Sequence, residues 1–211
     1  MAIVHMSAEP IRISLTDFVD FSIKVGPPKL TKVNELRRRG NYSPATDFWK
    51  PLRDALVDLH ESGRMDRRQL DAFLKTVSDG KKVSRYTDAC AGYKSFLGRK
   101  RIDWFASPQA IWVPNRLKVR VKPELGLTID GHPHIVKLYF KNDKLSKQRV
   151  ELVTYLMRDR LKKSAPAGAR FCVLDIAHAK LHHASENGGN LFPLLMGEAA
   201  AFVAMWESLD A

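Results

Sequence analysis

Glu124 and Lys137 are the charged residues whose types and spacing could perform chemistry together. They lie in the stretch PELGLTIDGHPHIVKLYFK, residues 123–141, where two segments rich in apolar residues flank an Asp-Gly dipeptide. Such a dipeptide between two predicted strands indicates a tight β-hairpin turn. If Asp130 pairs with Pro133, Lys137 becomes a diagonal neighbour of Glu124 on the same face of the sheet.

A carboxylate and an ammonium at one spot would suit the metal-assisted hydrolysis of a phosphodiester. The carboxylate would hold a hard divalent cation, Mg²⁺ or Mn²⁺, which polarises the phosphate and generates hydroxide. The lysine would offset the charge that develops in the transition state. In this interpretation Glu124 binds the metal, Lys137 stabilises charge and Tyr139 lines the site. The alternative is an ordinary cross-strand salt bridge on a solvated face of the sheet.

The spacing of apolar residues predicts the elements that must position this hairpin. Helices are expected at about 14–26, 46–63, 66–77, 80–97, 145–163 and 193–209, with a short helical stretch that ends at residue 40. Strands are expected at 115–122, 125–130, 134–140 and 169–176, and 179–184 is expected to pair with the last of these as a hairpin. The predicted fold is α+β, with a central mixed sheet. Residues 1–78 form a helical N-terminal part, and residues 79–211 form a core of helix, three strands, helix and strand that continues into an extra strand and a C-terminal helix.

This order of elements, over residues 80–176, resembles the core of the PD-(D/E)XK nuclease-like superfamily. In that family the second core strand opens with Pro-Asp, and the third carries an acid, any residue and a lysine. Pro123 and Glu124 stand at the first of these places in this chain, and Ile135-Val136-Lys137 stands at the second. The resemblance implies a nuclease that depends on Mg²⁺ or Mn²⁺.

Ile135 occupies the place of the family's acid, so a working metal site would need a second carboxylate from another element. Some members of the family carry that carboxylate on a neighbouring helix, where Glu151 is the candidate in this chain. Gln148 of the same predicted helix resembles a glutamine that some relatives use near the site. Without Glu151 on the metal, the site would be inherited but inactive.

The chain is strongly basic, and its positive charge is concentrated in the middle. It has 35 lysines and arginines against 23 aspartates and glutamates, a net charge of +12, and residues 79–122 hold 11 basic and 3 acidic side chains. Such a field attracts polyanions, and we expect nucleic acid, DNA rather than RNA, as the partner. The predicted contact residues are Lys81, Lys82, Arg85, Arg99, Lys100, Arg101, Lys118, Arg120 and Lys122. A non-catalytic module that holds nucleic acid or a protein partner with this basic face is the alternative to a nuclease.

The remaining features bound the class of protein. Cys90 and Cys172 lie in apolar patterns, and we expect buried thiols in a reducing compartment, the cytoplasm. No run of 18 apolar residues occurs, so no membrane span is predicted. Histidines form a His-x-His pair at 132 and 134 and a loose cluster at 178, 182 and 183. We expect both groups at exposed turns rather than on zinc.

Overall fold

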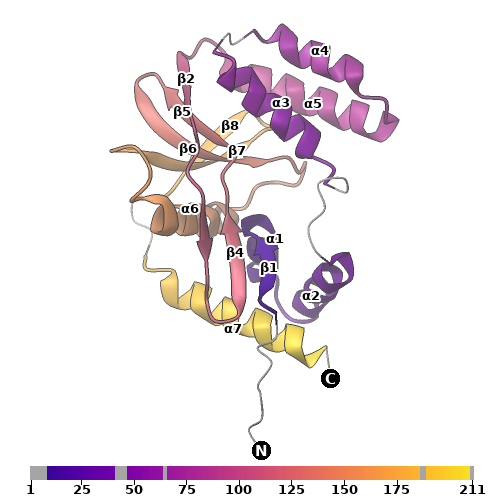
Figure 1. Cartoon of the computed structure of the whole chain (residues 1–211), viewed down its shortest axis with the longest axis vertical. Coiled ribbons are helices and arrows are strands. Elements are labelled where there is room, and N and C mark those ends of the chain that lie inside the picture. The colour runs from indigo at the N-terminus through magenta and orange to yellow at the C-terminus, as the bar shows by residue number, and fades with distance from the viewer. Residues whose placement is uncertain (1–8, 41–46, 64–65, 186–188, 210–211) are drawn as a thin grey trace, which may run out of the picture.

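The computed structural model describes residues 9–40, 47–63, 66–185 and 189–209, which form helices and two β-sheets (Figure 1). The helices are α1 (Leu15–Ser22), α2 (Pro27–Arg39), α3 (Lys50–Glu61), α4 (Arg68–Thr76), α5 (Gly80–Leu97), α6 (Lys147–Leu161) and α7 (Phe192–Ser208). The strands are β1 (Ile11–Ser14), β2 (Ile102–Phe105), β3 (Ala110–Trp112), β4 (Leu117–Val121), β5 (Leu125–Ile129), β6 (His132–Tyr139), β7 (Arg170–Asp175) and β8 (Lys180–His183). The α+β class predicted from the sequence is confirmed.

The larger sheet contains five strands in the order β2-β5-β6-β7-β8. β6 and β7 run parallel and are connected through α6, whereas the other neighbouring strands are antiparallel. Along the chain, α5 and β2 are followed by β3 and β4, which belong to the smaller sheet, and then by β5, β6, α6 and β7. Within the larger sheet the succession is therefore helix, three strands, helix and strand, with β3 and β4 inserted between its first two strands.

The smaller sheet has the order β1-β4-β3, with β1 parallel to β4. β4 is the strand predicted at 115–122, but it does not pair with β5, as the predicted succession required. β2, which the sequence pattern did not reveal, takes that place beside β5. Strict alternation along β4 indicates a strand with one solvent-exposed face, but it carries no information about the partner strands. One of these, β1, lies near the start of the chain.

The turn of the β5–β6 hairpin has two residues, as predicted, but it lies one residue earlier in the chain. Ile129 pairs with His132 across the turn, and the φ angles of Asp130 and Gly131 are 49° and 84°. A two-residue hairpin turn of type I′ requires positive φ at both of these positions. The predicted pairing of Asp130 with Pro133 is therefore wrong by two positions in the register. A shift of two residues leaves every side chain on its predicted face of the sheet.

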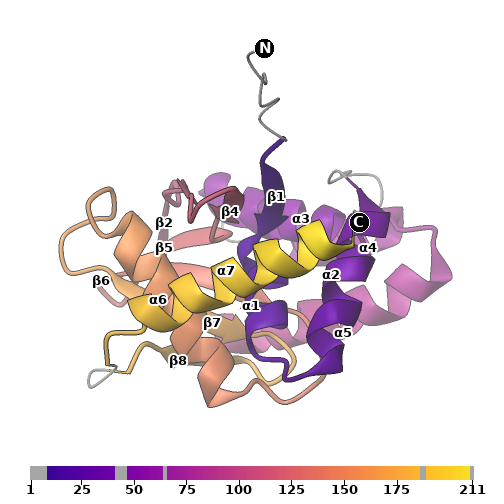
Figure 2. The same cartoon turned by 90° about the horizontal axis from the view of Figure 1, so that it is seen from below.

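Apolar cores cover both faces of the larger sheet. One core packs α3 and α5 against the face that carries Leu125 and Val136, which was predicted as core. The other packs α1, α6 and α7 against the opposite face and the smaller sheet (Figures 1 and 2). The solvated face expected around Glu124 is therefore wrong, because Ile135 and Tyr139 on that face are only 0% and 8% exposed.

The N-terminal part of the chain contributes to both cores. β1, α1 and α2 supply apolar residues between Ile11 and Leu36 to the core under the smaller sheet. α3 and α4 supply residues between Leu52 and Leu70 to the core on the other face of the larger sheet. Figure 2 shows α7 crossing the end of the molecule where it meets α1 and α2.

Local signals placed most of the helices correctly. The hydroxyl of Ser14, one of two candidates with Thr16 for the start of this helix, accepts a hydrogen bond from the Asp17 N–H at 3.1 Å and caps α1. Thr46, the predicted cap of the helix that became α3, lies outside the described residues. Cys90 and Cys172 are buried free thiols, as expected. Within the described ranges, none of the helices combines the length and apolar character that crossing a membrane requires.

Candidate functional site

Glu124 and Lys137 contact each other on the face of the larger sheet that α6 covers. The Lys137 ammonium donates to Glu124 Oε1 and, at 3.3 Å, to the carbonyl oxygen of Lys122. The backbone N–H of Leu138 donates to Glu124 Oε2 at 2.8 Å. The two side chains are only 12% and 14% exposed. Protein donors therefore occupy both carboxylate oxygens, the atoms that a metal ion would need.

Ile135 is the first residue of the triplet that ends in Lys137, and it is fully buried in the core beneath α6. It offers no ligand, and the packing around it leaves no polar position for one. The site therefore depends on a carboxylate from outside the hairpin.

Glu151, the predicted source of that carboxylate, lies elsewhere. It sits 3.7 Å from the Lys147 ammonium and lines a surface pocket of about 340 Å³ together with Tyr155 and Arg158. Glu124 is not among the residues of that pocket. Residues two apart on a helix project about 200° from each other. Arg149 stacks over Tyr139 on β6, with its guanidinium carbon 5.6 Å from the ring centre, so Glu151 points away from the β6 side.

The carboxyl ends of the parallel strands β6 and β7 bring a further acid to this face, which the sequence analysis did not identify. Asp175 pairs with Tyr139 in the register and is 3% exposed. Its carboxylate accepts hydrogen bonds from Nδ1 of His178 at 2.9 Å and from the His178 backbone at 3.3 Å. Strand spacing puts Asp175 roughly 12 Å from Glu124 between Cα atoms, and separate protein donors hold the two carboxylates. The signal available in the sequence was the position of Asp175 at the end of an apolar strand.

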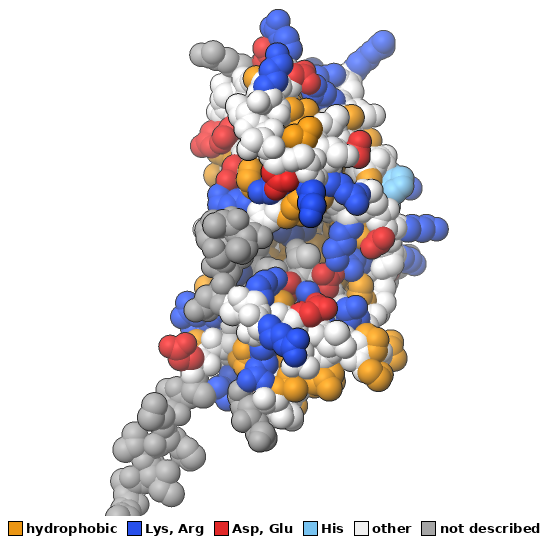
Figure 3. Space-filling model, turned by 90° about the vertical axis from the view of Figure 1, so that its right-hand side faces the viewer, with side chains coloured by type: hydrophobic (Ala, Val, Ile, Leu, Met, Phe, Trp, Pro, Cys, Tyr) orange, Lys and Arg blue, Asp and Glu red, His pale blue; other side chains and the backbone are white. Residues whose placement is uncertain are grey.

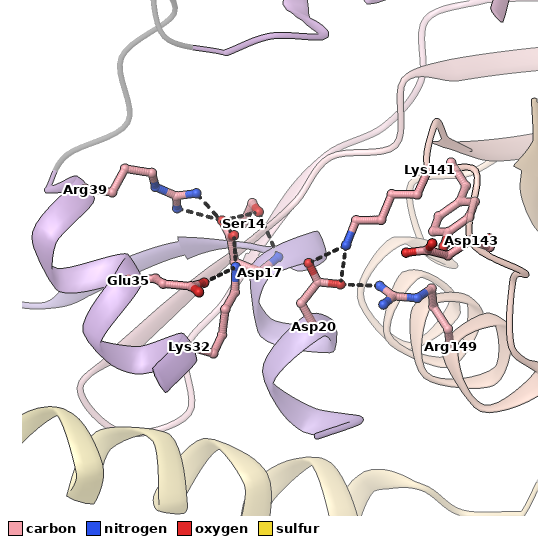
Figure 4. Close-up of polar contacts among 10 residues, drawn as sticks. Ser14, Asp17, Asp20, Lys32, Glu35, Arg39, Lys141, Asp143 and Arg149 are labelled. Atoms are coloured by element: carbon pink, nitrogen blue, oxygen red, sulfur yellow. Dashed lines mark hydrogen bonds and ion pairs between the residues drawn. The ribbon is translucent and has the colours of Figure 1, made fainter. Parts of the chain in front are cut away.

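Two acids of α1 form polar contacts with other elements, Asp20 with Lys141 and Arg149 and Asp17 with residues of α2 (Figure 4). Asp20 accepts from the Lys141 ammonium at 3.0 Å and from the guanidinium of Arg149. Burial also raises the pKa of the Tyr139 hydroxyl beneath Arg149. Asp20 therefore ties α1 to the β6–α6 loop and to the start of α6.

Asp17 forms the second half of this polar junction. It accepts from the guanidinium of Arg39 at 2.8 Å, from the Ser14 hydroxyl at 2.8 Å and from Lys32 at 3.3 Å (Figure 4). Burial alone would raise the pKa of Asp17. Hydrogen bonds from Arg39 and Ser14 and the charge of Lys32 outweigh burial and hold the pKa below its usual value of 3.8. Figure 3 shows basic and acidic side chains on the sides of a hollow between the α3–α5 layer and the part that holds α1 and α2.

The carboxylates around Glu124 and Lys137 are thus all held by donors from the protein. Among the residues that the structure describes, no group of three acids, histidines or cysteines that could share a metal ion includes Glu124, Glu151, Asp175 or Asp20. The arrangement can neutralise charge and fix neighbouring elements, and a divalent cation would have to displace lysine or arginine side chains.

The predicted basic residues lie in three separate places. Lys81, Lys82 and Arg85 belong to the first turns of α5, while Arg99, Lys100 and Arg101 follow its end. With 18 residues, α5 separates these two groups by about 27 Å. In the third group, Lys118 and Arg120 alternate with buried residues along β4 on the face of the smaller sheet that points away from the core, and Lys122 follows the end of the strand. The structure does not bring the three groups together into the single basic face that was expected.

The smaller sheet adds a basic residue that the sequence analysis missed. Arg12 of β1 is exposed and lies opposite Lys118, while Arg120 lies opposite Ser14 on one side and Ile111 of β3 on the other. Buried and exposed residues alternate along Ile11–Ser14 as they do along β4, and this short alternation was the available signal.

Histidines predicted at exposed turns come together with a cysteine on the opposite face of the larger sheet. His132 is exposed as expected, but His134 is only 4% exposed, which corrects the expectation for that residue. His134, Cys172 and His183 each offer a ligand atom, and these atoms lie within 4.8 Å of one another. Burial lowers the pKa of both imidazoles and raises the pKa of the Cys172 thiol to about 12.

A comparison of the chain with protein-family models found no match, and a comparison with curated proteins found none either.

We predict that Glu124 and Lys137 form a structural pair whose members depend on each other. Lys137→Met leaves a nearly buried carboxylate without its cation and should lower the free energy of unfolding by about 2 kcal/mol. The double variant Glu124→Gln with Lys137→Met should recover part of that loss, with a coupling energy of about 1 kcal/mol or more in urea unfolding. Purely additive effects in this double-mutant cycle would contradict the assignment.

We predict that Asp17→Asn destabilises the protein in a way that depends on pH. Because the folded-state pKa lies below the usual 3.8, ionised Asp17 contributes stability above that pH, and the contribution is lost as the pH falls further. At pH 7 the free energy of unfolding of the variant should be about 2 kcal/mol lower than that of the parent. Urea unfolding at several pH values should show the difference shrinking below about pH 4. A difference that stays the same down to pH 3 would remove the ion pair as its cause.

Proposed function

We propose that the protein binds nucleic acid, DNA in particular, through the outward face of the smaller sheet, and that it does so without catalysis. The single observation that carries this proposal is the set of basic side chains on that face. Arg12, Lys118 and Lys122 have no acidic partner among the described residues, and Arg120 of β4 stands between Lys118 and Lys122, the residue that follows β4.

The spacing of these side chains suits a phosphate backbone. Alternate residues of a strand lie about 6.6 Å apart, so Lys118 and Lys122 span about 13 Å. A DNA strand presents a phosphate about every 3.4 Å along the helix axis, so this face can meet several phosphates of one strand. Ile111 and Val113 beside it are 60% and 52% exposed and offer apolar contact to sugars or bases.

The surroundings of Glu124 and Lys137 support the absence of catalysis. Glu124 has both oxygens engaged, Ile135 stands where the PD-(D/E)XK family has an acid, and Glu151 points to another pocket. The succession of α5, β2, β5, β6, α6 and β7 supports a nuclease-like ancestry in which the fold was kept while the metal ligands were not. The buried free thiols of Cys90 and Cys172 support a reducing compartment such as the cytoplasm.

We predict that loss of charge on β4 weakens DNA binding more than an equal loss elsewhere. The variant Lys118→Gln with Lys122→Gln should bind duplex DNA about tenfold more weakly, and the slope of log affinity against log salt should fall by about 2, one for each phosphate that the variant no longer neutralises. The matched control is Lys162→Gln with Lys163→Gln, an exposed pair after α6 that should leave both quantities unchanged. Fluorescence anisotropy over a salt series measures both, with duplex RNA as the second ligand. Equal losses in the two variants, or binding that does not respond to salt, would refute the proposed face.

A metal-dependent nuclease is the second candidate, favoured by the contact of Lys137 with Glu124 and by Asp175 at the carboxyl ends of β6 and β7. Our proposal predicts that plasmid DNA stays supercoiled with the protein in Mg²⁺ or Mn²⁺. Nicking that requires the metal, disappears in Lys137→Ala and persists in Lys163→Ala would establish the nuclease instead. Nicking that is equal in all three proteins would indicate a contaminant.

A further inference from the structure

Three strands of the larger sheet bring two imidazoles and a thiol to one place. Cys172 of β7 pairs with His183 of β8, and Val136, the neighbour of Cys172 on β6, is two residues from His134. Residues two apart share a face, so all three side chains point to the face that α5 covers. This is the opposite face from Glu124 and Lys137, and it lies towards the amino-terminal ends of the parallel strands.

The distances between the three groups are close to those of a tetrahedral metal site. Metal–ligand bonds of 2.0–2.3 Å place neighbouring ligand atoms about 3.5 Å apart. Sγ of Cys172 and Nδ1 of His183 are already 3.2 Å apart, and all three ligand atoms lie within 4.8 Å. The rings of His134 and His183 have centres 5.8 Å apart. Because His183 is exposed at the end of β8, a side-chain movement of about 1 Å would complete the geometry.

His134 is held as metal-binding histidines usually are. Its Nδ1 lies 2.7 Å from the carbonyl oxygen of His132. A carbonyl oxygen only accepts, so Nδ1 carries the proton and the lone pair of Nε2 is left for a metal. Such a hydrogen bond from the non-ligating nitrogen to a carbonyl fixes the tautomer and the orientation of the ring.

We propose that His134, Cys172 and His183 bind one zinc ion. Two imidazoles and a thiolate form a borderline to soft donor set, which suits Zn²⁺ and disfavours Mg²⁺ and Mn²⁺. The site is separate from the proposed nucleic-acid face and does not depend on it. Of all described residues, these three form the only group of three histidines, cysteines or acids close enough to share an ion.

A surface pocket leaves room for a fourth ligand. His134 and His183 line a pocket of about 310 Å³ together with Asp130, Lys100 and Arg170. Cys172 is fully buried beneath it. The Lys100 ammonium donates to the carbonyl oxygen of Phe96. The ion would therefore have three protein ligands and one water, and it would fasten the edge strand β8 to β6 and β7.

Cobalt substitution tests the proposal on the full-length protein after removal of metals with a chelator. Co²⁺ should bind with a stoichiometry of one, give the near-ultraviolet charge-transfer absorption of a thiolate ligand, and be displaced by Zn²⁺. Competition with a chromophoric chelator should give a Kd for Zn²⁺ of about 1 µM or tighter. In Cys172→Ser the charge-transfer absorption should vanish, and in His183→Ala the Kd should rise at least tenfold.

Matched variants separate the site from unspecific binding. Cys90→Ser removes the other buried thiol and His178→Ala removes another histidine of the β7–β8 segment, and both should bind Co²⁺ like the parent. If Cys172→Ser does not fold, His183→Ala at the exposed end of β8 decides the question. No thiolate absorption in the parent, or the same absorption and Kd in His183→Ala, would overturn the proposal. If Cys172 and His183 form only a hydrogen bond and bind no metal, the parent protein will show no thiolate absorption with Co²⁺.

Discussion

The register of β6 between its two neighbours is the constraint on which both the Glu124–Lys137 contact and the group of His134, Cys172 and His183 depend. The two-residue turn at Asp130 and Gly131 fixes β6 against β5, and the parallel pairing through α6 fixes it against β7. Odd-numbered residues of β6, such as Lys137, then face α6, and even-numbered ones, such as His134, face α5. A slip of one residue would exchange the two sets and bury a lysine under α5. The apolar residues on both faces therefore hold the lysine and the histidine where their partners are.

Charge compensation explains why the described face around Glu124 and Lys137 offers no open metal site. A carboxylate at a core boundary is costly unless a cation or hydrogen-bond donor satisfies it. Here Lys137 pairs with Glu124, and both Arg149 and Lys141 pair with Asp20. His178 donates a hydrogen bond to Asp175. A hydrolytic site needs an excess of acids, which the metal ion then neutralises. Here the carboxylates are balanced by protein side chains, and binding of a divalent ion would leave those cations unpaired.

Local patterns were enough to predict most of this fold, and contacts between distant segments were not. The cap at Ser14, the buried face of α6 and the double burial of β7 follow from spacing along a few residues. The partner of β4 could not be predicted, because β1 is only four residues long and lies far from β4 in the sequence. β2 was missed because its four residues, Ile102–Phe105, are too few to establish a period.

The same distinction between local patterns and distant contacts applies to the candidate residues. The contact of Glu124 with Lys137 was predictable because one turn controls it, even with the register wrong by two. The separation of Glu151 from Glu124 was not, since it depends on the rotation of α6 about its axis. The grouping of His134, Cys172 and His183 also requires the strand order β6-β7-β8, which no spacing in the sequence reveals.

The two proposed sites lie on different sheets and share no residue, so each must be judged on its own measurements. β4 belongs to the smaller sheet and faces solvent with its basic side chains, whereas the metal site lies on the α5 side of the larger sheet. α6 contacts both β4 and β8 and is the evident physical link between them. Its apolar face is tightly packed, with Leu156 and Met157 fully buried. A packed helix transmits a change only where two arrangements compete. Nucleic-acid binding and zinc binding are therefore expected to be independent, and the absence of one would leave the other unaffected.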